Sequence, residues 1–220
     1  MGPSSLQAFH RAVARFSSLP RGEGMPKRTP PLPVTPFHTT IECDTHQAHT
    51  IIGAPTLSCK SPLALSLNLL TNMIGGPGMN SLLNIELREK RGLVYNVEAS
   101  SALLTDTGVT SIYFGCAPED TPQCLDIINR NLKRLAANLI GSARLDRARK
   151  QFAGQLLLTR LQPETEALSL PRRLMRHNCC LPLEQRLALL DTVTPSSLLE
   201  AASLLSPENL STLTMSGTLA

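Results

Sequence analysis

The stretch "ELREKRGLVY", residues 86–95, joins the end of one expected element to the start of another. Its first residues follow a helical pattern, and Gly92 occupies the place just past a helix end where glycine is common. The residues after Gly92 have the composition of a strand. Arg88 is therefore expected at a helix end and Tyr95 on the following strand. A guanidinium and a phenol meet at one helix–strand junction, with no catalytic base or nucleophile beside them in the sequence.

Two interpretations of this pair are open from spacing alone. In the first, Arg88 is a solvated residue that favours the negative end of a helix, and Tyr95 is half-buried on a sheet. In the second, the two side chains converge on a site at the junction. Both are hydrogen-bond donors, so together they suit a carbonyl, a carboxylate or the oxyanion of a tetrahedral intermediate. Such groups bind and stabilise, and another group would have to activate water.

The surrounding pattern predicts an α+β domain with a mostly antiparallel sheet backed by helices on one face. No regular alternation of strand and helix is present, which argues against a parallel sheet. A glycine-rich turn, "GGPGMNS", separates the two helices that precede the junction. The expected strands are 46–55, 93–101, 108–118 and 209–217, and the expected helices are 61–75, 80–90, 121–141, 142–161, 164–178, 183–190 and a last one capped by Thr194.

The N-terminal part is set apart from this domain. Residues 1–22 contain a helical stripe of Leu6, Phe9, Val13 and Phe16. Residues 23–37 are rich in proline, which suits an extended linker. The domain itself is expected over residues 38–220. The first 22 residues also carry Arg and Ser without an acid, as a mitochondrial transit peptide does.

Composition narrows the classes of function. The chain has 220 residues, a formal net charge of +4 and only 3% aromatic residues. Its charges are spread along the chain, so a nucleic-acid partner is not expected. It has no apolar run of membrane-spanning length and no hydrophobic signal-peptide region, so no membrane partner is expected. Six cysteines without C-x-x-C spacing favour buried thiols and a reducing compartment such as the cytoplasm, but the compartment stays undecided.

Other kinds of chemistry find little support. His46 and His49 are three residues apart, which would place them on opposite faces of the strand expected there. No H-E-x-x-H or H-x-x-E-H string occurs, so no residue of this chain is assigned to a metal. No nucleophile elbow is present. The turn "GGPGMNS" lacks the Lys–Ser/Thr of a phosphate-binding loop and follows a helix rather than a strand.

The segment "IGGPGMNSLLNIELREKRGLVYNVEASS" resembles the C-terminal half-domain of the pitrilysin/insulinase family of zinc metallopeptidases. The similarity extends more loosely over residues 38–218, and the bacterial and mitochondrial-processing-peptidase branch is the nearest match. "LQAFHRAVARFSSLPRG" is similar to the last helix of the catalytic half that precedes such a domain. This resemblance accounts for the separate N-terminal helix better than a transit peptide does, and it implies a LuxS/processing-peptidase-like metallohydrolase fold.

The resemblance also implies a function. The chain would be the substrate-binding half of a zinc endopeptidase that closes around peptides, with zinc and its ligands supplied by the N-terminal half or by a zinc-bearing subunit. Arg88 and Tyr95 match the family's arginine and tyrosine that contact substrate and stabilise the attacked carbonyl oxygen. Gly75, Gly76, Gly78 and Asn80 match a loop that lines the substrate chamber. Alone, the chain would be inactive. A non-catalytic scaffold with the same fold is the alternative, and a homodimer stays open.

Overall fold

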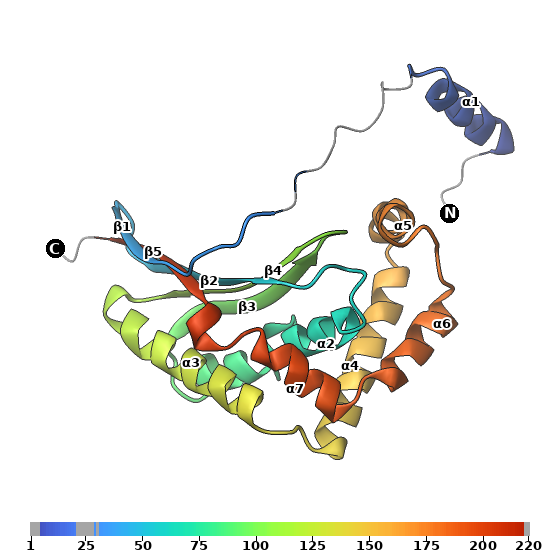
Figure 1. Ribbon diagram of the computed structural model, residues 1–220. Helices are drawn as coiled ribbons and strands as arrows, with labels where there is room; N and C mark the ends of the chain where they lie inside the picture. The colour runs from blue at the N-terminus through green and yellow to red at the C-terminus, as the bar shows by residue number, and fades with distance from the viewer. Residues whose placement is uncertain (1–4, 21–28, 30, 218–220) are drawn as a thin grey trace.

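The computed structural model describes residues 5–20, 29 and 31–217, so parts of the expected 1–22 helix region and 23–37 linker lie outside the described residues. A sheet and the helices packed on it form the body of the molecule (Figure 1). In chain order the elements are α1 Leu6–Ser17, β1 His38–Cys43, β2 Ala48–Thr56, α2 Ala64–Gly75, η1 Asn84–Glu89, β3 Val94–Leu103, β4 Gly108–Cys116, η2 Pro118–Asp120, α3 Thr121–Ala137, α4 Ser142–Arg160, α5 Pro163–His177, α6 Leu183–Ala188, η3 Leu189–Thr192, α7 Pro195–Ser203, η4 Pro207–Asn209 and β5 Ser211–Gly217.

The five strands lie in the order β1-β5-β2-β4-β3. The pairs β5–β2, β2–β4 and β4–β3 are antiparallel, which confirms the expected sheet type. The pair β1–β5 is parallel and was not expected, because residues 38–43 were not assigned to a strand. The two edge strands of the described sheet are thus β1 and β3. The helix–strand junction at residues 86–95 leads into the edge strand β3.

Helices cover one face of the sheet. In Figure 1, α2, α3 and α7 all lie on the same side of the strands. Along β2, buried residues alternate with residues that are partly exposed, as expected for a sheet with one packed face. The packed face carries the fully buried Phe114, while Ile51 and Val109 on the other face are 49% and 50% exposed. The open face is therefore partly apolar.

The end of α2 is pressed against β3. A Cβ added to Gly75 would lie 2.7 Å from the backbone nitrogen of Ala99 and 2.9 Å from its Cβ, so only glycine allows this approach. Helix α4 is joined to the same part of α2, because Asn72 Nδ2 donates to Gln155 Oε1 over 2.7 Å. These contacts place the glycine-rich turn beside the edge strand.

Some expected element ends are wrong. Helix α3 ends at Ala137 instead of Gly141, because the backbone of Asn138 is extended. The expected helix 80–90 has its π-helical part at Asn84–Glu89. The Thr194 cap is confirmed, since its side chain accepts from Ser197 N over 3.1 Å.

Helix α1 has no buried residue, and the same holds for α5. Its apolar stripe is open to solvent, with Leu6 73% and Phe16 75% exposed. Among the described residues, no helix is long and apolar enough to cross a membrane.

Candidate functional site

The helix–strand junction is built by η1 and the turn that follows it. Gly92 has φ +64°, a left-handed conformation that closes the helix end, as the sequence predicts. Its N–H donates to Arg88 O over 2.9 Å, and the N–H of Leu93 donates to Leu87 O over 2.9 Å. Leu87 is fully buried, which anchors η1 to the core and turns Arg88 outward.

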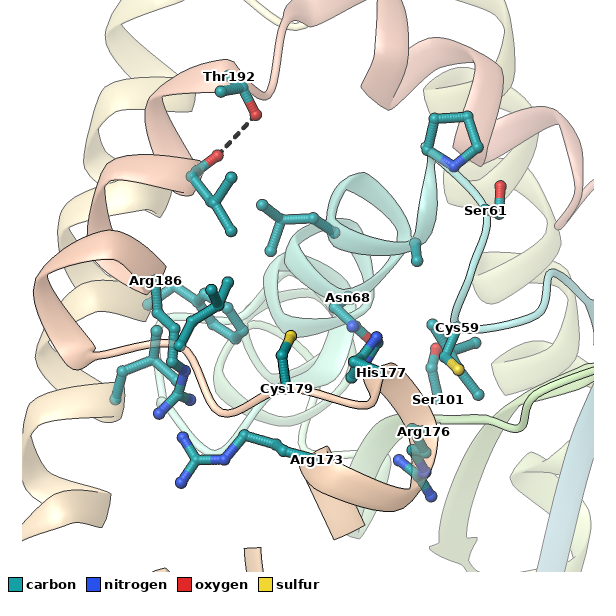
Figure 2. A pocket seen from close by; sticks show the side chains of 18 residues that line it. Cys59, Ser61, Asn68, Ser101, Arg173, Arg176, His177, Cys179, Arg186 and Thr192 are labelled. Carbon is teal, nitrogen blue, oxygen red and sulfur yellow. Dashed lines mark hydrogen bonds between the residues drawn. The ribbon is translucent and has the colours of Figure 1, made fainter. Parts of the chain in front are cut away.

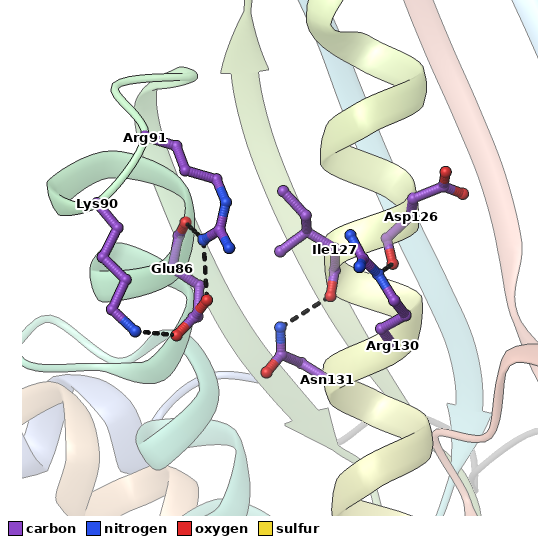
Figure 3. A network of polar contacts seen from close by, with 7 residues as sticks. All are labelled: Glu86, Lys90, Arg91, Asp126, Ile127, Arg130 and Asn131. Carbon is purple, nitrogen blue, oxygen red and sulfur yellow. Dashed lines mark hydrogen bonds and ion pairs between the residues drawn. The ribbon is translucent and has the colours of Figure 1, made fainter.

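Glu86 holds two of the three cations in this segment (Figure 3). Its carboxylate accepts from Lys90 Nζ over 2.6 Å and from Arg91 over 2.9 Å. These two hydrogen bonds, that from Lys90 first, lower the pKa of Glu86 below its ordinary value. Arg88, by contrast, has no hydrogen bond or ion pair to any described residue. No described residue therefore occupies the donors of its guanidinium.

Arg88 lines a pocket of about 240 Å³ beside the edge strand. Gly75 and Gly76 of the glycine-rich turn line the same pocket, as do four consecutive residues of β3, 96–99. Because successive side chains of a strand point to opposite faces, a pocket that touches four in a row lies along the strand's edge. The structure thus brings together three of the six residues that the resemblance assigned to the site.

Tyr95 lies outside the lining of this pocket. It sits at a β-bulge between Val94 and Asn96, and its side chain is 61% exposed. A bulge places two residues opposite one on the partner strand and redirects their side chains. Asn96, the second residue of the bulge, lines the pocket. No hydrogen bond joins Tyr95 to Arg88 in the described part of the chain, so their convergence on one ligand stays a prediction.

Gly78 and Asn80 also lie outside the pocket lining. Asn80 forms two hydrogen bonds with Gln151 of α4: Asn80 Nδ2 donates to Oε1 over 2.9 Å, and Gln151 Nε2 donates to Asn80 Oδ1 over 3.1 Å. A Cβ at Gly78 would lie 2.5 Å from Gln151 Nε2. Asn80 thus holds the glycine-rich turn against α4, and at Gly78 a side chain would meet that of Gln151.

The sequence reasoning missed Asn84, Asn96 and Glu98, which also line the pocket. Asn84 is four residues before Arg88, so both lie on one face of η1, and this spacing could have identified it. Asn96 and Glu98 are two apart on β3, as residues on the same face of a strand are. Together with Arg88 they offer both donors and acceptors, which is the combination needed to bind a peptide backbone.

The described residues contain no group of three or more His, Cys, Asp or Glu side chains placed to hold a metal ion. His49 is instead paired with Tyr113, whose hydroxyl lies 2.8 Å from His49 Nδ1 and whose ring stacks on the imidazole. No step through zinc is assigned to the described residues.

Comparisons with known proteins place the chain in a family. The family model described as "Peptidase M16 inactive domain" matches residues 3–152. An uncharacterized zinc protease of Streptomyces coelicolor, SCO5738, is 34% identical over 114 residues, which are 52% of this chain and 25% of that protein. The uncharacterized zinc protease YmxG of Bacillus subtilis is 32% identical over 126 residues, 56% of this chain and 31% of the relative.

The fold agrees with this match. The crystal structure of a peptidase M16 inactive domain from Pseudomonas fluorescens has a TM-score of 0.80 and 20% identity, and the alignment covers 100% of this chain and 53% of that one. The chain thus spans about a quarter to a third of the curated relatives above and about half of this structure. The mitochondrial-processing-peptidase branch stays a prediction. Because the family model matches more than half of its residues, this chain belongs to the M16 peptidases, as their inactive domain.

Proposed function

We propose that this chain is the substrate-binding half of a zinc-dependent endopeptidase that encloses peptides between two halves. The observation that carries the proposal is the guanidinium of Arg88 in the pocket beside β3, which has no hydrogen bond or ion pair to a described residue. Glu86 neutralises Lys90 and Arg91, so the free cation of this segment is the one that faces the pocket. A guanidinium there can donate to the carbonyl oxygen of a bound peptide and stabilise it as negative charge develops.

The edge position of β3 supports an extended polypeptide as the ligand. Backbone N–H and C=O groups along a sheet edge can pair with another strand. The pocket runs along residues 96–99 of this edge, and its side-chain groups are mixed donors and acceptors. Tyr95, exposed at the bulge directly before these residues, would supply a second donor to the same peptide.

The catalytic metal and its ligands would come from a preceding half. The relatives that match are named zinc proteases and are three to four times longer than the matched region. When bound there, zinc would activate the water that attacks the peptide. We assign α1 to the end of that half: its exposed apolar stripe, Leu6 to Phe16, is the surface expected of a helix that packs on a domain absent here.

The test compares variants of the complete two-half protein in cleavage of a quenched fluorescent peptide. Arg88→Ala is expected to lower kcat/KM by roughly 30- to 1,000-fold, because loss of one oxyanion donor costs about 2–4 kcal/mol. Tyr95→Phe is also expected to lower kcat/KM. Lys90→Ala is the matched control: it removes a cation two residues from Arg88 that is bound to Glu86, and activity should hold within about twofold.

Equal activity of Arg88→Ala and Lys90→Ala would show that the free guanidinium has no part in catalysis. Peptide binding that depends on Arg88 without any cleavage, in a protein whose preceding half lacks an H-x-x-E-H motif, would favour the scaffold alternative instead.

A further inference from the structure

A second and larger pocket lies on the helical side of the domain, away from Arg88. Its volume is about 580 Å³, within the usual range for small-molecule sites. It is lined by the N-terminal part of α2 and the loop before it, the end of β3, α4, the end of α5, the segment leading into α6, α6 itself and η3 (Figure 2). Segments far apart in the sequence, from Cys59 to Thr192, converge on it.

One side of this pocket is cationic. Arg173, Arg176 and Arg186 line it together with His177, and no Asp or Glu is among its lining residues in the described part of the chain. Figure 2 shows the guanidinium groups of Arg173 and Arg186 on the same side of the pocket. Two positive charges held together in a partly buried place repel each other, which favours a bound anion between them.

The bonding of these arginines leaves capacity for such an anion. Arg173 Nη2 donates to Glu166 Oε1 over 2.6 Å and to Ser169 Oγ over 3.2 Å, but the Nε of Arg173 is buried and has no partner among the described residues. Arg186 has no hydrogen bond or ion pair within the described residues. Burial first, and then the charge of Arg173, lower the pKa of Arg186, and the negative charge of Glu166 opposes this shift without cancelling it. Glu166 therefore offsets only part of the positive charge.

The rest of the lining is mostly apolar. Leu65, Leu103, Phe152, Leu156 and Leu189 form walls that a hydrocarbon chain would bury. A ligand with a charged head alone would leave these walls in contact with water. One with an apolar body alone would leave Arg186 without an ion pair and the Nε of Arg173 without an acceptor among the described residues. The two kinds of lining therefore select for an amphipathic anion.

We propose that this pocket binds a carboxylate carried on an apolar chain, with the carboxylate between Arg173 and Arg186 and the chain along the leucine and phenylalanine walls. The guanidinium fork matches a carboxylate in shape and charge. This ligand chemistry has two sources, a medium-chain fatty acid or the free C-terminus of a hydrophobic peptide. The site is separate from the pocket of Arg88 and does not depend on the peptidase function.

Calorimetry on the 220-residue chain tests the proposal with decanoate, decyltrimethylammonium and acetate. Decanoate is expected to bind at least about tenfold more tightly than either of the others, since only it matches both linings. N-acetyl-Leu-Leu with a free C-terminus, compared with its C-terminal amide, distinguishes the two sources. Binding of decanoate alone identifies a fatty-acid site, and binding of the free-acid peptide but not the amide identifies a peptide C-terminus.

Arg186→Gln separates a binding role from a structural one. It removes a charge that has no ion pair among the described residues and is only partly offset by Glu166, so the thermal midpoint of the unliganded chain should change little, while decanoate affinity falls about tenfold or more. Arg176→Gln, which removes another lining cation, should also weaken binding. Arg130→Gln on α3 is the matched control, because Arg130 lies outside the pocket and donates to a backbone oxygen. The affinity of the Arg130→Gln variant for decanoate should equal that of the parent.

The alkylation rates of two adjacent thiols report independently whether a ligand occupies the pocket. Cys179 lines the pocket, whereas the neighbouring Cys180 does not, and both are exposed. Decanoate should slow alkylation of Cys179 by iodoacetamide and leave that of Cys180 unchanged. Equal binding of the cationic and anionic amphiphiles, no binding of any carboxylate, or an equal loss of affinity in Arg130→Gln would each overturn the proposal.

Discussion

Replacing Gly75 with alanine tests whether close packing of α2 on β3 shapes the candidate site. The new Cβ would lie 2.7 Å from Ala99 N and 3.1 Å from the carbonyl carbon of Glu98. Both are backbone atoms of a paired strand, so relief requires the helix end or the strand to move. Overpacking of this kind costs about 1–3 kcal/mol.

Gly154→Ala is the matched control, because it lies inside α4 and an added Cβ there meets nothing within 4 Å. Gly154→Ala gains helix propensity, up to about 1 kcal/mol, whereas Gly75 is the last residue of α2 and gains less, so propensity adds to the gap that overpacking opens. The free energy of unfolding of Gly75→Ala should therefore fall below that of Gly154→Ala by about 1–3 kcal/mol or slightly more. Gly154→Ala itself should be as stable as the parent or more stable.

The measurement is urea unfolding followed by far-UV circular dichroism, since the chain has no tryptophan for fluorescence. The difference corresponds to roughly 2–12 °C in the thermal midpoint of a domain of this size. Equal stability of the two variants would show that the strand accommodates a methyl group and that the approach of α2 to β3 is not constrained by Gly75.

Three further predictions concern the junction and the last helix. Gly92→Ala should lower the free energy of unfolding by about 1–2 kcal/mol in urea titrations, because alanine resists the φ of +64°; an unchanged midpoint would contradict this. Glu86 has a lowered pKa when folded, so its stabilising effect is present above its unfolded pKa and is lost as pH falls through the folded value. Glu86→Gln should therefore be less stable than the parent at pH 7, by under about 1 kcal/mol because the pairs are partly exposed, and the gap should close toward pH 3; a gap that widens in acid would refute the assignment. Thr194→Ala should cost about 1 kcal/mol of unfolding free energy through loss of its cap, and thermal melts that coincide with the parent's would exclude that role.

Local signals predicted much of the fold. The order of elements from β2 onward follows from hydrophobic patterns, and Gly92 and Thr194 mark helix ends by their chemistry alone. Strand β1 was missed although "HTTIEC" contains β-branched residues. The partner of β1, β5, lies more than 170 positions later in the sequence. All but one of the residues of β1 are exposed, so no alternation of buried and exposed residues reveals this strand.

The candidate site was only partly predictable for a similar reason. Arg88 and the glycines were found because a local motif carries them. Which residues reach the pocket depends on the bulge at Tyr95 and on the contact of the turn with α4, and both need tertiary structure. The arginine pocket had no sequence signal, because Arg173 and Arg186 meet walls contributed by α2, β3 and α4 only after folding.

The parallel pairing of β1 with β5 limits how far the chain can be truncated from its N-terminal side without exposing a sheet edge. A chain shortened to begin after Cys43 would keep every helix of the body and still lose the strand that shields Ser211–Gly217. Strand β5, which carries Leu213 and Met215, would then become an edge strand with unpaired backbone groups. Such a fragment would be expected to associate with copies of itself through the unpaired edge of β5.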